Sequence, residues 1–183
     1  MRFVNMLCLM LSFVAILGCG STMDDLNPSG TDKRPEVQTG TTGPAVGQKA
    51  PEFTLSDTLG NSISLSSVLP ESKGIVLYFT MWCPVCDTDM SHMRSSVMPS
   101  FPDLRVFLVD YVSGSVADAR NAAIANGYAG PEFTVLADTD HGVSDTYHAT
   151  MGTTVVIDTA GVVRMNEEYK DGARLMTVLG DLP

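Results

Sequence analysis

Two apolar segments stand out in the middle of the chain, at residues 75–79 (IVLYF) and 105–109 (RVFLV), the second of them apolar after Arg105. A strand that is buried on both faces needs such a run, whereas a half-buried strand alternates apolar and polar residues. A segment with helical features follows each run, from residue 84 to about residue 98 and from residue 116 to residue 126, where Gly127 closes it. The pattern predicts strands buried in a layered sheet.

The remaining pattern predicts three more strands and two more helices. The strands are expected at residues 133–137, 153–157 and 162–165, and the helices at 143–147 and 172–179. A short β-hairpin of residues 53–55 and 63–65 leads into them. The turn at residues 158–161 is too short for a crossover helix, so its two strands must be antiparallel. We therefore expect an α/β fold with a central mixed sheet flanked by helices.

The first 18 residues have the features of a targeting segment. Arg2 is followed by an apolar run that continues to Leu17, and its length of about 15 residues is short of the roughly 20 that a membrane-spanning helix needs. The sequence around Gly18 and Cys19 resembles a bacterial lipoprotein cleavage box, which implies that Cys19 is lipidated and becomes the first mature residue. A short membrane helix and ordinary secretion are the alternatives.

Composition divides the rest of the chain into a tether and a domain. Residues 19–45 are rich in Gly, Ser, Thr, Pro and Asp and predict a flexible tether, and residues 46–183 predict one globular domain. Formal net charge is -10, and because Arg2 is the only charged residue before Cys19, the remainder carries 10 basic and 21 acidic residues. Such an acidic surface should repel nucleic acid.

Cysteine usage points to redox chemistry. Of the four cysteines, Cys8 leaves with the signal segment and Cys19 would carry lipid, so Cys83 and Cys86 remain. The N-terminus predicts an extracytoplasmic protein, lipid-anchored to a bacterial membrane and facing the periplasm. Two free thiols in that compartment are expected to form a disulfide unless a dedicated reductant acts on them.

The Cys-Pro-Val-Cys motif lies where a predicted buried strand gives way to a helix. There the free backbone N–H groups and the helix dipole favour the thiolate of Cys83. Pro84 suits the first helical position because its missing N–H would have no partner there. Cys86 lies one turn further along the same face. We therefore expect Cys83 to attack a disulfide and Cys86 to resolve the resulting mixed disulfide.

The domain resembles the TlpA-like and ResA-like membrane-tethered thioredoxins of the wider AhpC/TSA redoxin superfamily. The resemblance rests on residues 46–55 (VGQKAPEFTL), the Gly60 turn, residues 82–86 (WCPVC) and residues 153–158 (TTVVID). It implies a thioredoxin-like three-layer sandwich and thiol/disulfide exchange with protein substrates and a redox partner protein. We expect no cofactor and no bound metal. Trp82, beside Cys83, is expected to be half exposed, to shield the disulfide and to offer a contact surface.

One position departs from the resembled family. Met151 and Gly152 stand where the family has a cis-proline facing the cysteines. Because of this position, we include Met151 and Gly152 among the predicted site residues. Substitution of Gly152 by proline is expected to alter partner selectivity more than stability.

Three other functions are open to the motif. A peroxiredoxin-like peroxidase has a Thr three residues before its cysteine, which Thr80 matches, but it also has a proline where Val76 stands. A zinc site needs four ligands, and no second Cys-x-x-Cys exists in the sequence. A binding protein with a permanent structural disulfide is the third, although a bridge that closes so short a loop stabilises little.

Overall fold

The computed structural model describes residues 37–183, which form one compact unit. The predicted signal segment and Cys19 lie outside the described residues. Residues 37–45 belong to the predicted tether. Within them, the Pro44 carbonyl accepts a hydrogen bond from the Asn166 side chain at 3.0 Å. The division of residues 1–45 into signal and tether stays a prediction. No helix within residues 37–183 is both long and apolar enough to cross a membrane.

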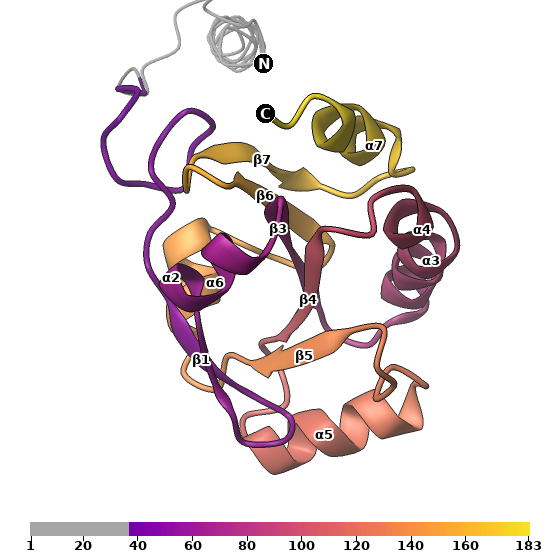
Figure 1. Cartoon of the computed structure of the whole chain (residues 1–183). Helices are drawn as coiled ribbons and strands as arrows, with labels where there is room; N and C mark the ends of the chain where they lie inside the picture. Colours follow the sequence, from indigo (N-terminus) through magenta and orange to yellow (C-terminus); the bar gives the residue numbers. More distant parts are fainter. Residues whose placement is uncertain (1–36) are drawn as a thin grey trace, which may run out of the picture. The chain divides into compact units, whose positions relative to one another are not determined.

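A seven-stranded mixed sheet forms the centre of this unit (Figure 1). Its strands, in chain order, are β1 (Thr54–Asp57), β2 (Ser62–Ser64), β3 (Gly74–Thr80), β4 (Arg105–Asp110), β5 (Thr134–Ala137), β6 (Thr153–Asp158) and β7 (Val163–Glu168). The spatial order is β2-β1-β5-β4-β3-β6-β7. Strands β3, β4 and β5 are parallel, and β6 pairs antiparallel with both β3 and β7. The predicted mixed sheet and the antiparallel turn at residues 158–161 are confirmed.

Helices flank both faces of the sheet. They are α2 (Leu65–Val68), the 3₁₀ turn η2 (Leu69–Glu71), α3 (Pro84–His92), the π-helical turn η3 (Met93–Val97), α4 (Met98–Ser100), α5 (Val116–Ala125), α6 (Gly142–Tyr147) and α7 (Ala173–Gly180). In Figure 1, α3, α4 and α7 lie on one side of the sheet, and α2 and α6 lie on the other. The helix expected at residues 84–98 is present, but a π-helical turn interrupts it.

Strand β3 shows why a continuous apolar run is needed at the centre. All seven of its residues are buried. Val76 and Tyr78 face the apolar cluster that contains α3 and α7, whereas Ile75, Leu77 and Phe79 face the cluster that contains α6. Because successive side chains point to opposite faces, a strand covered by helices on both sides must be apolar at every position. The carboxyl end of this strand leads directly to the cysteines.

Candidate active site

A sharp bend between β3 and α3 places Cys83 at the start of the helix. Trp82 adopts a left-handed backbone conformation with φ of 58°, and its amide donates to the Thr80 hydroxyl oxygen at 3.1 Å. Cys83 is then the N-cap residue of α3 with an extended backbone, and Pro84 follows within the first turn. The predicted strand-to-helix junction is present, and it directs the Cys83 side chain toward the free N–H groups of the helix.

Both cysteines are thiols, and their sulfur atoms lie 3.0 Å apart. The Cys86 amide donates to Cys83 Sγ at 3.3 Å, which completes the cap of the helix. Cys83 is half-buried, whereas Cys86 is fully buried in the apolar cluster beneath α3. Only the first sulfur is therefore open to a large partner.

Hydrogen bonds lower the pKa of the buried thiol, Cys86. Burial raises the pKa of the Cys86 thiol, but hydrogen bonds from Cys83 and from backbone amides outweigh that effect, and the pKa is lowered overall. A thiol 3.0 Å from a thiolate stabilises the anion by donating to it. Solvent access is the clearest difference between the two sulfur atoms, because Cys83 is half-buried and Cys86 is fully buried.

A buried carboxyl group lies one turn beyond Cys86. Asp89 is 6% exposed, and its Oδ2 accepts a hydrogen bond from the Tyr78 hydroxyl at 2.8 Å. Burial raises the pKa of Asp89, although the hydrogen bond from Tyr78 and the proximity of His92 oppose that shift. Burial, Asp89 and Cys86 together raise the pKa of Tyr78. The sequence alone predicted no site role for Asp89 or Tyr78. The spacing of three residues between Cys86 and Asp89 places these two on one helix face and is the signal that could have identified Asp89.

A second buried carboxylate fixes the tryptophan. Trp82 Nε1 donates to Asp110 Oδ2 at 2.8 Å, and the indole ring lies 6.3 Å from the Tyr128 ring. Asp110 also accepts hydrogen bonds from Val112 and Ser113. In the parallel register Thr80 of β3 pairs with Asp110 of β4, so both strands end at the same edge of the sheet. Asp110 could have been found from the sequence, because it ends a predicted parallel strand.

Met151 and Gly152 reach the cysteines from the loop before β6. Met151 Sδ lies 3.2 Å from Cys83 Sγ, so the structure brings this predicted residue to the site. The Gly152 amide donates to the Phe79 carbonyl at 2.9 Å, its carbonyl accepts from the Tyr169 amide, and its φ is 80°. No peptide bond within the described residues is cis.

This geometry contradicts the expectation for a proline at position 152. Proline fixes φ near −65°, so it cannot adopt the left-handed φ of Gly152. It also has no N–H and cannot donate the hydrogen bond that Gly152 makes to the Phe79 carbonyl. The substitution should therefore act first on stability.

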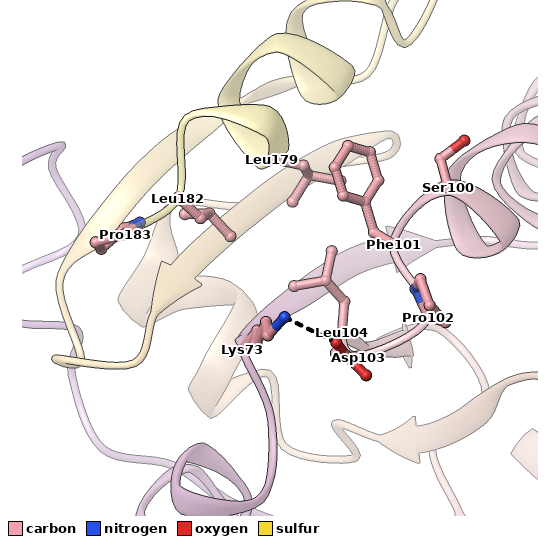
Figure 2. Close-up of a pocket in the computed structure, with 9 residues that line it drawn as sticks. All are labelled: Lys73, Ser100, Phe101, Pro102, Asp103, Leu104, Leu179, Leu182 and Pro183. Carbon is pink, nitrogen blue, oxygen red and sulfur yellow. Dashed lines mark ion pairs between the residues drawn. The ribbon is translucent and has the colours of Figure 1, made fainter.

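Two cavities of the domain differ in their relation to the cysteines. A groove of about 160 Å³ adjoins them, and it is lined by Val85, Asp89, Met151, Gly152, Glu168, Tyr169 and Lys170. A cavity of about 220 Å³ lies between the C-terminus and the loop before β4, where Lys73 pairs with Asp103 at 2.9 Å (Figure 2). Lys73 comes just before the start of β3, and Cys83 comes just after its end. The second cavity therefore lies at the opposite end of this strand from the cysteines. The groove beside the cysteines is the candidate site.

Comparison with known proteins places this site in a family. The model of the AhpC/TSA family matches residues 46–166. The chain is also 31% identical over 121 residues to the thiol-disulfide oxidoreductase ResA of Bacillus subtilis (strain 168), an alignment that covers 64% of each chain. The chain thus spans just under two thirds of the length of that relative.

Solved structures share the fold. MTB dsbF, described in its mixed oxidised and reduced forms, is 25% identical with a TM-score of 0.59 over 72% of this chain and 95% of its own. The thioredoxin domain of a thiol-disulfide oxidoreductase from Bacteroides vulgatus is 18% identical with a TM-score of 0.61, over 76% and 99% of the two chains. These likenesses confirm the predicted thioredoxin-like fold.

Proposed function

The chain belongs to the AhpC/TSA family, and from this premise we propose that it is a thiol/disulfide oxidoreductase that acts on protein substrates. The observation that carries the proposal is the pair of thiols 3.0 Å apart at a helix start, one half-buried and one fully buried. In this proposal Cys83 is the attacking thiol and Cys86 is the resolving thiol. Trp82, Pro84, Met151 and Gly152 support them.

The exchange proceeds in two steps. The Cys83 thiolate attacks a substrate disulfide, so that a Cys83–substrate bond forms, the substrate S–S bond breaks, and the first substrate sulfur leaves and takes up a proton. Cys86 then loses its proton and attacks Cys83 Sγ, which forms the Cys83–Cys86 disulfide and releases the second substrate thiol. Two electrons and two protons pass to the substrate, and the reverse sequence oxidises a dithiol substrate. A redox partner protein restores the starting state of the pair.

Asp89 and Tyr78 are placed to take the proton that Cys86 must lose. Burial raises the pKa of Asp89, and the Tyr78 hydroxyl interacts with both Asp89 and Cys86. A carboxylate with a raised pKa accepts a proton more readily than an ordinary one near neutral pH. We assign the Cys86 proton to Asp89 by way of the Tyr78 hydroxyl.

The cellular setting is also part of the proposal. The segment that ends at Cys19 supports export, lipidation and anchoring to a bacterial membrane on the periplasmic side. The protein partners would then be disulfides or thiols outside the cytoplasm.

Thr80 lends no support to the alternative of a peroxidase. Its side chain is fully buried, and its hydroxyl oxygen accepts a hydrogen bond from the Trp82 amide. The Thr80 hydroxyl also hydrogen-bonds the Cys86 thiol. The threonine that matches the peroxidase pattern therefore supports the bend and contacts the buried cysteine, whereas the pattern pairs it with Cys83.

Reduction of the insulin disulfides, with dithiothreitol as electron source, tests the proposal. The unaltered chain should accelerate the reaction, and Cys83→Ser should abolish the acceleration. A reduction potential far below about −300 mV would mark a structural bridge. Such a potential, together with no acceleration, would contradict the proposed activity.

A further inference from the structure

Three sulfur atoms from two distant segments meet at the start of α3. Cys83 Sγ lies 3.0 Å from Cys86 Sγ and 3.2 Å from Met151 Sδ, although Met151 is 68 positions further along the chain. Within the described residues no group of three His, Cys, Asp or Glu side chains could hold a metal ion. A methionine sulfur is a different kind of ligand, and only the folded chain brings it to the thiols.

The surroundings of these sulfurs are mostly apolar. Cys86 is fully buried, and Cys83 and Met151 are half-buried against the same apolar cluster, together with Trp82. Two carboxyl groups near the cysteines already have hydrogen-bond donors: Asp89 accepts from the Tyr78 hydroxyl, and Asp110 accepts from the indole N–H of Trp82. Hard cations require several oxygen ligands and do not suit this arrangement. A soft cation that binds two or three sulfur ligands suits this arrangement.

We infer that the reduced protein binds one Cu(I) ion between Cys83 Sγ, Cys86 Sγ and Met151 Sδ. Thiolates and thioethers are the ligands that select Cu(I) among the metals available to proteins. A metal with three sulfur ligands at about 2.3 Å, the length of a zinc–thiolate bond, separates them by roughly 4 Å. The Cys83–Cys86 and Cys83–Met151 sulfur distances, 3.0 and 3.2 Å, lie within about 1 Å of that spacing. Binding displaces the thiol protons of the pair, and no electron is transferred.

The backbone around Met151 supports a fixed ligand position. Gly152 is held by hydrogen bonds to the Phe79 carbonyl and from the Tyr169 amide, so the loop that carries Met151 is tied to β3 and to the end of β7. The inference rests on the reduced thiols and not on the proposed exchange activity. It also implies competition, because a Cys83–Cys86 disulfide cannot bind the ion.

Anaerobic titration of the full chain with Cu(I) against the chromophoric competitor bicinchoninate tests the inference. Cys8 and Cys19 are replaced by serine so that Cys83 and Cys86 are the remaining thiols. One equivalent of Cu(I) should bind to the reduced protein and none to the oxidised protein. Met151→Leu should lower the affinity for Cu(I) at least about tenfold. Loss of a residue that only contacts a metal ligand already lowers metal affinity by about that factor, and Met151 is proposed as a ligand itself. X-ray absorption should count three sulfur neighbours in the unaltered protein and two in this variant.

Met81→Leu is the matched control, because Met81 lies in the same bend but is 43% exposed and is not one of the three ligands. Its affinity for Cu(I) should be unchanged. Equal affinities for the unaltered protein and Met151→Leu, with two sulfur neighbours in both, would overturn the site. Insulin reduction by the unaltered, copper-free protein is measured in parallel, because reduction without copper binding, or copper binding without reduction, separates a failure of this inference from a failure of the proposed function.

Discussion

At the scale of single residues, the main contrast is between two neighbouring thiols that differ in their access to solvent. The fully buried Cys86 receives a hydrogen bond from the half-buried Cys83, which lowers the pKa of Cys86 despite its burial. In the proposed exchange, the order of reaction follows from which sulfur a protein partner can reach. The same proposal assigns Asp89 to the second step, in which the buried thiol must lose its proton.

Asp89→Asn should slow the resolving step and stabilise the fold at neutral pH. Burial raises the pKa of Asp89 in the folded state, so its ionisation opposes folding as the pH rises above the ordinary range of an aspartate. Asparagine removes that cost and still accepts a hydrogen bond from Tyr78. Thermal unfolding from pH 3 to pH 8 should show a gain in melting temperature that grows with pH and vanishes at the acidic end.

Stopped-flow measurement of mixed-disulfide decay provides the kinetic arm of this test. Asp87→Asn is the control, because Asp87 occupies the same turn but accepts its hydrogen bond from Tyr128. Equal decay rates for Asp89→Asn and the unaltered protein at neutral pH would remove Asp89 from the proton path.

At the scale of elements, the loop before β6 determines what faces the cysteines. Gly152 has a left-handed φ of 80°, and a Cβ there would find its nearest neighbour, Asp89 Oδ2, at 3.9 Å. Space is therefore available, and backbone conformation is the constraint. The sequence identified Gly152 as a departure from a family pattern, but the direction of its φ and its hydrogen bond to Phe79 are visible only in the fold.

Gly152→Ala should lower the free energy of unfolding by about 1–2 kcal/mol, the cost of the left-handed conformation for a residue with a Cβ. Gly152→Pro should cost more, because proline also removes the donor to Phe79. Urea unfolding of both variants measures the two costs. A proline variant as stable as the unaltered protein would mean that this loop adopts another conformation.

The elements that the sequence predicted well are those whose burial dictates their composition. Strands β3 and β4 lie inside the sheet and need apolar side chains on both faces, so their runs were visible, and the short turn after β6 fixed an antiparallel pair. The π-helical turn η3 and the short helix α2 were missed because no strong local signal marks them. The resemblance placed Met151 at the site, but the approach of its sulfur to Cys83 Sγ depends on how β6 packs beside β3 and could not be predicted from the sequence.

At the scale of the whole molecule, the proposed account combines an exchange domain with an anchor. Several acyl chains hold a protein to a membrane firmly, whereas one chain does so only marginally. Cys19→Ala should therefore move the protein from the membrane fraction to the soluble fraction, as fractionation and immunoblotting would measure. The Cys83→Ser variant is the control and should stay with the membrane. An unaltered protein found wholly in the soluble fraction would contradict the anchor.

The central claim is that Cys83 attacks and Cys86 resolves, and trapping of mixed disulfides tests it most directly. Full-length Cys86→Ser and Cys83→Ser variants are incubated with oxidised insulin, quenched with acid, alkylated and separated under non-reducing conditions, with mass spectrometry to locate each adduct. Cys86→Ser should accumulate a covalent adduct at Cys83, because nothing resolves it, and Cys83→Ser should accumulate none at Cys86, because that thiol is fully buried. Equal trapping by the two variants, or an adduct found mainly at Cys86, would contradict the account.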